Sequence, residues 1–184
     1  MKNLDVRARY TRQVIEEQFL LLLGEKPCAK ITVTELCRGA RLNRATFYKH
    51  YKDVPDLLER TERQLLDNLR KTVEGHIPGN LEALLLSVTS YMRQYGKKYM
   101  ALGSEHGDPA LAAKTFLVCY EWAYPLLTAN LPHLDEGRRE LLYQFLSHGS
   151  GGVLTAWLRG GMAQGPEEVA GFLTEVCTGA AARL

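Results

Sequence analysis

Apolar residues recur at helical spacing along most of the chain, and they predict a succession of helices. The first stripe runs over residues 5–23 and stops before Gly24 and Pro27. Its apolar members are Tyr10, Val14, Ile15, Phe19, Leu22 and Leu23. Alternation by two never persists for more than a few residues, so no strand pattern competes with the helices. An all-α fold is the economical interpretation.

Longer stripes follow in the second part of the chain, and glycine or proline bounds most of them. They predict one helix from residue 54 to a break at residues 75–79 and another over residues 81–102. Asp108 and Pro109 open a further helix, which we expect to be bent or interrupted at Pro125. The last two predicted helices cover residues 135–159 and 166–178.

Two short helices between residues 32 and 51 carry stronger local signals. Thr32 and Glu35 are spaced as a capping box, in which the Thr32 hydroxyl accepts from the Glu35 amide and the Glu35 carboxylate accepts from the Thr32 amide. Asn43 is a good N-cap for the second helix, which we expect over residues 44–51. Residues 39–42 leave room only for a tight turn between the two helices.

Two short helices joined by a four-residue turn, the second of them basic, are the parts of a helix-turn-helix. The DNA major groove accepts one α-helix, and the first turns of that helix face the base edges. Arg44 is suited to guanine, Ala45 to a thymine methyl group, and Thr46 to a base or a phosphate. Phe47 is expected to point inward and to fix the angle between the helices. Its expected packing partners are Leu36, Ala40 and Leu42.

The distribution of charge favours the same segment. The chain has a net charge of only +2, but its first 60 residues contain twelve basic and eight acidic side chains. Residues 38–52 contain no acidic residue, and their basic residues are Arg38, Arg41, Arg44, Lys49 and Lys52. A basic run is usually a solvated face, but beside a helix-turn-helix it attracts phosphate groups. We therefore expect Tyr48, Lys49, His50 and Lys52 to hold the DNA backbone.

The run Thr46-Phe47-Tyr48-Lys49-His50-Tyr51-Lys52-Asp53, preceded by residues 31–37 and followed by Leu57-Leu58, resembles the DNA-binding domain of TetR-family transcriptional regulators. Residues 149–162 and 166–168 are similar to a TetR-like C-terminal domain of Gram-positive members, including the dihydroxyacetone kinase regulator type. The resemblance implies a homodimer that places two recognition helices in successive major grooves. The predicted DNA-contacting residues are Thr32, Thr34, Arg41, Asn43, Arg44, Ala45, Thr46, Tyr48, Lys49, His50 and Lys52.

Two residues depart from the family pattern. Arg41 stands in the turn where the family usually has glycine, and a positive φ at this residue would cost roughly 1–2 kcal/mol. A phosphate contact of Arg41 would offset that strain. Val54 stands where the family usually has lysine, so one expected contact to the DNA backbone is missing. We expect a correspondingly lower affinity for DNA.

We expect residues 1–53 to form the helix-turn-helix DNA-binding domain and residues 54–184 an effector-binding and dimerisation domain. The resemblance implies a dimer interface that the last two long helices build as a four-helix bundle. The predicted interface residues are Phe145, Gly149, Gly152, Val153, Trp157, Val169, Phe172 and Val176. Small residues in these helices would let a neighbouring backbone approach closely. The alternative is that the same stripes belong to a core within one chain.

Aromatic residues are concentrated in the middle of the chain, where the resemblance implies a cavity for a small-molecule effector. The predicted ligand-binding residues are Tyr91, Tyr95, Tyr99, Phe116, Cys119, Tyr120, Trp122 and Tyr124. Tyrosine hydroxyls can orient a mostly apolar ligand. The alternative is an ordinary helical core, which is the more common origin of an aromatic stripe.

Other chemistry has little support. The four cysteines match no zinc spacing, no two histidines stand at metal-binding helical spacing, and no catalytic motif occurs in its required context. We therefore predict no cofactor, no metal and no enzymatic activity. No apolar run is long enough to cross a bilayer, and no leader sequence is visible, so we expect a cytoplasmic protein.

These observations together predict a homodimeric transcriptional regulator, with repression as the default. It would bind a pseudo-palindromic operator in double-stranded DNA and change its affinity when an effector binds. The alternative is a helical ligand-binding co-regulator that acts through protein contacts without specific DNA binding. Arg41 and Val54 are the residues that favour this alternative.

Overall fold

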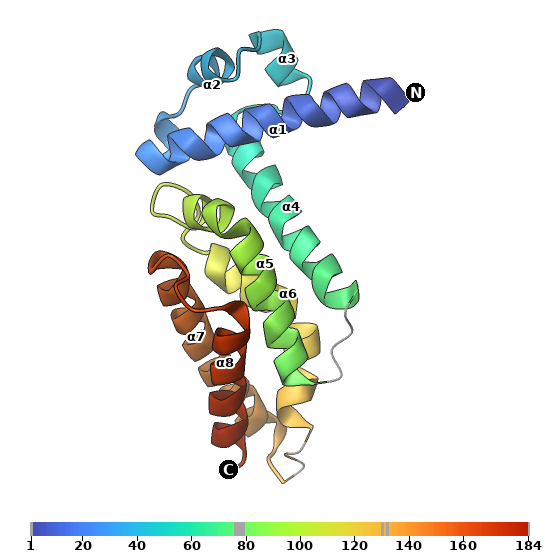
Figure 1. Cartoon of the computed structure of the whole chain (residues 1–184), viewed down its shortest axis with the longest axis vertical. Helices are drawn as coiled ribbons and strands as arrows, with labels where there is room; N and C mark the ends of the chain where they lie inside the picture. The colour runs from blue at the N-terminus through green and yellow to red at the C-terminus, as the bar shows by residue number, and fades with distance from the viewer. Residues whose placement is uncertain (1, 76–79, 130, 132, 184) are drawn as a thin grey trace. The chain divides into compact units, whose positions relative to one another are not determined.

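The computed structural model describes residues 2–75, 80–129, 131 and 133–183, and this part of the chain is helical throughout, with no strand (Figure 1). The all-α prediction is confirmed. The elements are α1 (Lys2–Glu25), the 3-10 helix η1 (Cys28–Lys30), α2 (Val33–Gly39), α3 (Arg44–Tyr48), α4 (Val54–Gly75), α5 (Leu81–Leu102), α6 (Leu111–Thr128), α7 (Glu136–Arg159) and α8 (Pro166–Ala181). None of these helices has the apolar length that spanning a bilayer requires.

The chain divides into two compact units. Unit 1 consists of Met1–Leu65 with Lys97–Leu111, and unit 2 consists of Leu66–Gly96 with Ala112–Leu184. Both α4 and α5 contribute residues to each unit. The boundary predicted between residues 53 and 54 divides the chain by function, into a DNA-binding part and an effector-binding and dimerisation part. That division stays a prediction.

Unit 1 is built around one face of α1. Ile15, Phe19 and Leu23 recur at helical spacing and are at most 1% exposed, while Phe47 of α3 and Leu57 of α4 are fully buried. Removing side chains of this size from water stabilises the unit by about 1.5–3 kcal/mol each. The buried face of α1 therefore supplies the support on which α2, α3 and the start of α4 are held.

The last turns of α5 and the loop after them belong to unit 1 because polar contacts bind them to its first residues. Lys98 Nζ lies 3.1 Å from Glu16 Oε2. His106 Nδ1 lies 3.0 Å from the carbonyl oxygen of Leu23, and the backbone NH of Cys28 donates to the carbonyl of His106 at 2.9 Å. The C-terminal half of α1 and the residue Cys28 that follows it are thus tied to residues 97–111.

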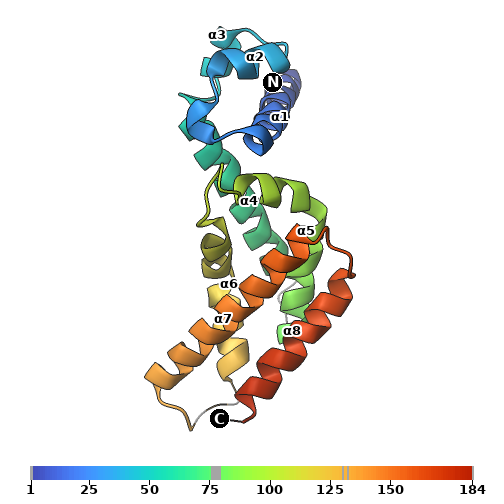
Figure 2. The ribbon, with the colours of Figure 1, turned by 90° about the vertical axis from the view of Figure 1, so that its left-hand side faces the viewer.

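In unit 2, α7 and α8 lie side by side and run in opposite directions (Figure 2). Leu142, Leu146 and Leu154 of α7 and Leu173 of α8 are at most 7% exposed. The loop between the two helices is fixed by Arg93 of α5, whose Nη1 donates to the carbonyls of Met162 and Gln164 at 3.0 Å each.

Three features of the helices differ from the sequence predictions. Helix α3 ends at Tyr48 and not at Tyr51, because the chain turns there toward α4 and Tyr51 is buried. Helix α6 is not interrupted at Pro125, which lies in its last turn. The irregular backbone is instead in α5, at Tyr95, with φ −111° and ψ 17°.

Candidate nucleic-acid interface

The start of α2 is fixed by the predicted capping box. The Glu35 amide donates to Thr32 Oγ1 at 3.2 Å, and the Thr32 amide donates to Glu35 Oε2 at 3.0 Å. Lys26 Nζ adds an ion pair to Glu35 Oε1 at 2.6 Å. The hydrogen bonds from Lys26 and then from Thr32 hold the pKa of Glu35 at about 2, well below its usual 4.5. Thr34, in the first turn of α2, is exposed.

Helix α3 begins with the predicted Asn43 cap. Asn43 Oδ1 accepts from the backbone NH of Thr46 at 2.7 Å and from the Thr46 hydroxyl at 2.9 Å. Arg44 and Ala45 are exposed in the first turn, while Thr46 is half-buried. The cap thus leaves the two residues best suited to base contact free of the protein body.

The Arg44 side chain extends along α3 toward its end. Its guanidinium carbon lies 5.9 Å from the centre of the Tyr48 ring, and Nη2 donates to the Tyr48 hydroxyl at 3.4 Å. A guanidinium stacked on an aromatic ring keeps most of its donors available. Tyr48 is itself 49% exposed, so the pair forms one exposed polar surface.

The opposite face of α3 is anchored by Phe47, as expected. Its ring is fully buried and lies 5.6 Å from the Tyr51 ring, between centres. Leu36 and Ala40 are also buried, and Leu42 is half-buried. Phe47 is buried on one face of α3, whereas Arg44 and Ala45 are exposed on the other. The face with Arg44 and Ala45 therefore points away from the rest of unit 1.

The turn between α2 and α3 has the expected strained residue. Arg41 has φ 54°, in the left-handed region that favours glycine. The turn is closed by a hydrogen bond from the Leu42 amide to the Cys37 carbonyl at 2.9 Å. The Arg41 side chain is exposed.

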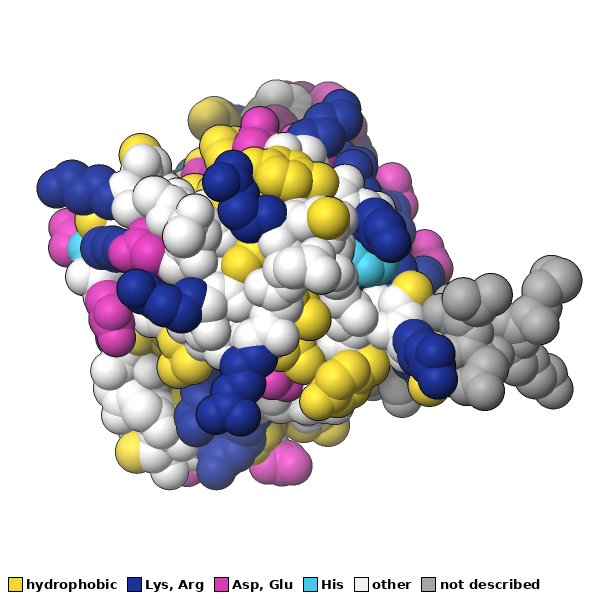
Figure 3. Space-filling view, turned by 90° about the horizontal axis from the view of Figure 1, so that it is seen from above, with side chains coloured by type: hydrophobic (Ala, Val, Ile, Leu, Met, Phe, Trp, Pro, Cys, Tyr) yellow, Lys and Arg dark blue, Asp and Glu magenta, His cyan; other side chains and the backbone are white. Residues whose placement is uncertain are grey.

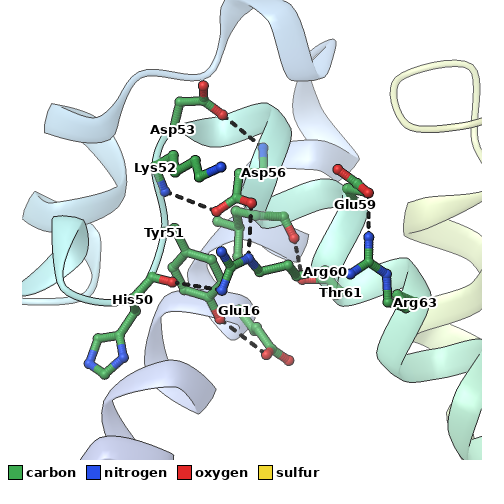
Figure 4. Close-up of polar contacts among 11 residues, drawn as sticks. Glu16, His50, Tyr51, Lys52, Asp53, Asp56, Glu59, Arg60, Thr61 and Arg63 are labelled. Carbon is green, nitrogen blue, oxygen red and sulfur yellow. Dashed lines mark hydrogen bonds and ion pairs between the residues drawn. The ribbon is translucent and has the colours of Figure 1, made fainter.

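The junction between α3 and α4 is organised by Asp56 (Figure 4). Its Oδ2 accepts from the backbone NH of Lys52 at 2.9 Å, and its Oδ1 accepts from Arg60 Nε at 2.9 Å. The Lys52 contact and then the Arg60 contact lower the pKa of Asp56. Arg60 Nη1 also donates to the His50 carbonyl at 3.3 Å. Sequence reasoning missed Arg60, although its i, i+4 spacing from Asp56 was visible.

Residues around this junction differ in exposure. Lys49 and Lys52 are exposed, His50 is half-buried, and Val54 is 5% exposed. The Asp53 carboxylate caps α4 by accepting from the Asp56 amide at 2.8 Å. Val54 therefore takes part in the core and offers no DNA contact. Figure 3 shows Lys and Arg side chains spread over this face, with acidic groups mostly toward its margin.

The predicted ligand-binding residues do not form one cluster. Tyr91 and Tyr95 pack together with 4.6 Å between ring centres, whereas Tyr120 and Tyr124 stack at 5.2 Å. Trp122 lies under Arg70, with the guanidinium carbon 5.7 Å from its ring centre. Tyr99 is buried in unit 1. The side chain of Phe116 lies outside the described part of the structure.

A hollow of about 890 Å³ lies between α6 and α7 in unit 2. Among the predicted ligand residues whose side chains are described, Tyr120 lines it. Its other lining residues are Leu117, Glu140, Tyr143, Gln144, Ser147, His148, Gly151, Gly152, Thr155, Ala156 and Arg159. Cys119 lines a smaller apolar cavity of about 50 Å³. Sequence reasoning missed Tyr143, which contacts both Tyr120 and Tyr124 and lines both spaces.

The predicted dimer residues fall into two groups. Phe145, Phe172 and Val176 are 71%, 53% and 48% exposed, and an added Cβ at Gly149 or Gly152 would meet nothing within 4 Å. Val153 is half-buried. Trp157 and Val169 are buried within the chain, and Trp157 Nε1 donates to the Gln164 carbonyl at 3.1 Å. These last two side chains belong to the core of unit 2, because their apolar surface is already covered.

Comparisons with known proteins agree with this geometry. A family of the TetR type, described as "Transcriptional regulator C-terminal region", matches residues 79–179, more than half of the chain. The uncharacterized HTH-type transcriptional regulator YxbF of Bacillus subtilis (strain 168) is 36% identical over 73 residues, which are 37% of this chain and 19% of YxbF. The chain thus spans less than a fifth of that relative.

Solved structures share the fold over nearly the full chain. A TetR transcriptional regulator from Streptococcus agalactiae 2603V has a TM-score of 0.69 and 24% identity, over 94% of this chain and 96% of that one. The dihydroxyacetone kinase operon activator DhaS has a TM-score of 0.65 and 14% identity, over 95% and 97%.

Proposed function

Because this chain belongs to the TetR family of transcriptional regulators, we propose that it acts as a homodimer that binds a pseudo-palindromic operator through α3. A small-molecule effector in unit 2 changes the operator affinity. One observation carries the proposal: α3 is capped by Asn43 and anchored by Phe47, so that Arg44 and Ala45 remain exposed. A helix held in this way fits the major groove. A protein that binds chromosomal DNA works in the cytoplasm, where we place it.

The predicted DNA residues take two roles in this proposal. Arg44 and Ala45 read base edges, because they lie in the first turn of α3 and are exposed. Thr32, Thr34, Arg41, Asn43, Thr46, Tyr48, Lys49, His50 and Lys52 hold the phosphates or shape the surface. The lost backbone contact at the buried Val54 is partly replaced by the exposed Arg41, which explains how a strained residue is retained in the turn.

Selection of bound duplexes from a random pool tests the DNA-binding proposal. The wild-type protein is expected to select a two-fold symmetric sequence with half-sites about one helical turn apart. Arg44→Ala is expected to cost about 1–3 kcal/mol and to relax specificity at one position of each half-site. Lys52→Ala is expected to weaken all sequences alike and to reduce the salt dependence. A protein that selects no sequence even at low salt is the co-regulator, not the DNA-binding regulator.

The exposed face of α7 and α8 supports the homodimer. Leu141 and Phe145 on α7 and Phe172 and Val176 on α8 form an apolar surface that unit 2 does not cover. Two hollows of about 650 and 620 Å³ flank it, one at Phe145 and one at Phe172. A two-fold interface uses the same patch on both copies, so each copy fills the hollows of the other. Sedimentation analysis of the wild-type chain tests this assembly.

We place the effector in the hollow between α6 and α7. Its volume of about 890 Å³ is in the range of cavities that hold a small organic molecule. Tyr120, Gln144, His148 and Arg159 supply polar groups around a wall that includes Leu117 and several small residues. An effector that binds more tightly at one spacing of the two α3 helices changes the affinity for DNA. Bound DNA then changes the affinity for the effector by the same factor. Repression relieved by the effector is our default, although the neighbour DhaS is named an activator.

Filling the hollow tests its role. Compounds that release the wild-type protein from its selected duplex are expected to lose this effect on Thr155→Trp, because the indole occupies the space between α6 and α7. The matched control is Thr178→Trp, on the exposed surface of α8. If the compounds release Thr155→Trp as effectively as the control, the effector binds elsewhere.

A further inference from the structure

The N-terminal half of α1 continues the core-facing stripe beyond the core. Ile15, Phe19 and Leu23 are buried at helical spacing. Arg12 stands three residues before Ile15 and shares its side of the helix, yet it is exposed. Arg9, one turn earlier, is exposed as well. The N-terminal half of α1 therefore extends beyond the core of unit 1 as an overhang. Figure 1 shows α1 continuing past α2 and α3 to its N-terminal end.

The overhang begins beside the residues that follow α3. The Tyr51 hydroxyl donates to Glu16 Oε1 at 3.4 Å, and Arg12 lies one turn before Glu16 on the same side of α1. The charge of Arg12 reaches this region: burial first, and then the charges of Arg12 and Lys49, lower the pKa of His50. Arg12 is thus a neighbour of the proposed phosphate-binding residues.

The arginines of the overhang have no acidic partner in the part of the chain that the structure describes. Arg9 and Arg12 are both exposed, and neither forms an ion pair there. Among the acidic side chains that the structure describes, Glu16 is the nearest to Arg12 on this side of α1, and it is already bound to Lys98 and Tyr51. At 1.5 Å per residue, Arg9 lies about 10 Å beyond Glu16 along the helix. Two exposed guanidinium groups therefore extend the basic surface away from α3.

We infer that Arg9 and Arg12 form a second DNA-binding element, which holds backbone phosphates of the duplex next to the groove that receives α3. The inference rests on the proposed DNA-binding function. Duplex DNA is the partner that fits, because its phosphates form a continuous row and guanidinium groups bind phosphate in pairs of hydrogen bonds. This element adds affinity without adding sequence information.

The test compares three variants on the duplex that the wild-type protein selects. Arg9→Gln with Arg12→Gln removes both charges, and Arg9→Lys with Arg12→Lys keeps them. Arg7→Gln is the matched control, because it changes the same charge on another side of the same helix. The three residues that are substituted, Arg7, Arg9 and Arg12, are all exposed. Melting temperatures equal to that of the wild type verify that each variant keeps the fold.

The salt dependence of affinity is the decisive measurement. Each phosphate contact contributes a slope of about 0.9, or about 3.5-fold in affinity between 50 and 200 mM salt. Each chain of the proposed homodimer loses two contacts, so the glutamine pair loses four per dimer. The fall in affinity between 50 and 200 mM salt is expected to be about 150-fold smaller than in the wild type, and the hydroxyl-radical footprint is expected to be shorter at its outer edges. The lysine pair and Arg7→Gln are expected to match the wild type.

The outcomes separate this inference from the proposed function. If the wild type selects and binds a duplex but the glutamine pair has the slope and footprint of Arg7→Gln, the role of α1 is overturned and α3 keeps its role. If the lysine pair behaves as the glutamine pair does, the two arginines act through packing and not through charge, which also overturns the inference. If the wild type binds no DNA, both proposals fail together.

Discussion

The surface of unit 1 that we propose binds DNA and the α7–α8 face of unit 2 are opposites in construction. The first is polar, and its backbone is shaped by short-range hydrogen bonds such as those of Thr32 and Asn43. The second is apolar, and its side chains Leu141 and Phe145 are each 71% exposed. Hydrogen bonds between residues close in the sequence can shape the first surface within a single chain. Monomers rarely expose large apolar patches without a function, and for this face we propose that a second copy of the chain covers it.

The difference predicts different responses to the loss of a phenylalanine ring. Phe47→Ala is expected to lower the free energy of unfolding by about 3–5 kcal/mol, because the ring is fully buried in unit 1. Phe145→Ala is expected to change the stability of the single chain by no more than about 0.5 kcal/mol and to weaken self-association instead. Urea unfolding measures the first effect, and sedimentation at several concentrations measures the second. Equal losses of stability in both variants would contradict the contrast.

Glycines on α7 provide a second way to separate association from folding. Gly149→Gln with Gly152→Gln is expected to leave the single chain folded, since a Cβ at either residue meets nothing within 4 Å. The same side chains would hold a second copy away, so operator affinity is expected to fall about 100-fold, or about 2.7 kcal/mol. Gly24→Gln, at the equally open Gly24, is the control. A variant that still forms dimers would place the interface elsewhere.

The strained turn at Arg41, in unit 1, is expected to give a smaller change in stability. Arg41→Gly is expected to raise the stability by up to about 1 kcal/mol, because relief of the positive φ exceeds the added entropy cost of glycine. The same change is expected to weaken DNA binding through the loss of one exposed charge. Thermal unfolding and gel shifts measure the two effects. A variant that gains stability without losing affinity would remove Arg41 from the proposed interface.

The smallest expected effect concerns the cap of α2. The folded state holds the pKa of Glu35 at about 2, below the usual 4.5, so its contribution to stability is present above about pH 4.5 and is lost as the pH falls to about 2. Glu35→Gln is therefore expected to have a slightly lower melting temperature at pH 7, with the gap closing toward pH 2. Salt narrows the gap too, because the Glu35 side chain is partly exposed. A gap that widens in acid would contradict the role of Lys26 and Thr32.

Sequence reasoning succeeded where a structure depends on a few consecutive residues. The capping box, the Asn43 cap, the buried Phe47 and the positive φ of Arg41 all follow from local chemistry. The eight predicted helices follow from periodicity.

Features that depend on packing between distant segments could not be predicted from the sequence. The irregular backbone at Tyr95 lies one residue before Gly96, where a Cβ would come within 2.9 Å of the Met162 sulfur. No periodic pattern reveals such a crossing. Periodicity placed Trp157 and Phe172 in one interface, but it cannot tell which apolar side chains the chain covers itself. The hollow between α6 and α7 was missed for the same reason.

The exposed apolar face on α7 and α8 has a quantitative consequence for gene control. When the operator accepts only paired chains, occupancy at low expression rises with the square of the number of chains in the cell. Doubling synthesis then quadruples the active species, whereas an already paired regulator would respond in proportion. In the proposed homodimer, the abundance of the regulator would thus change operator occupancy more steeply than in proportion.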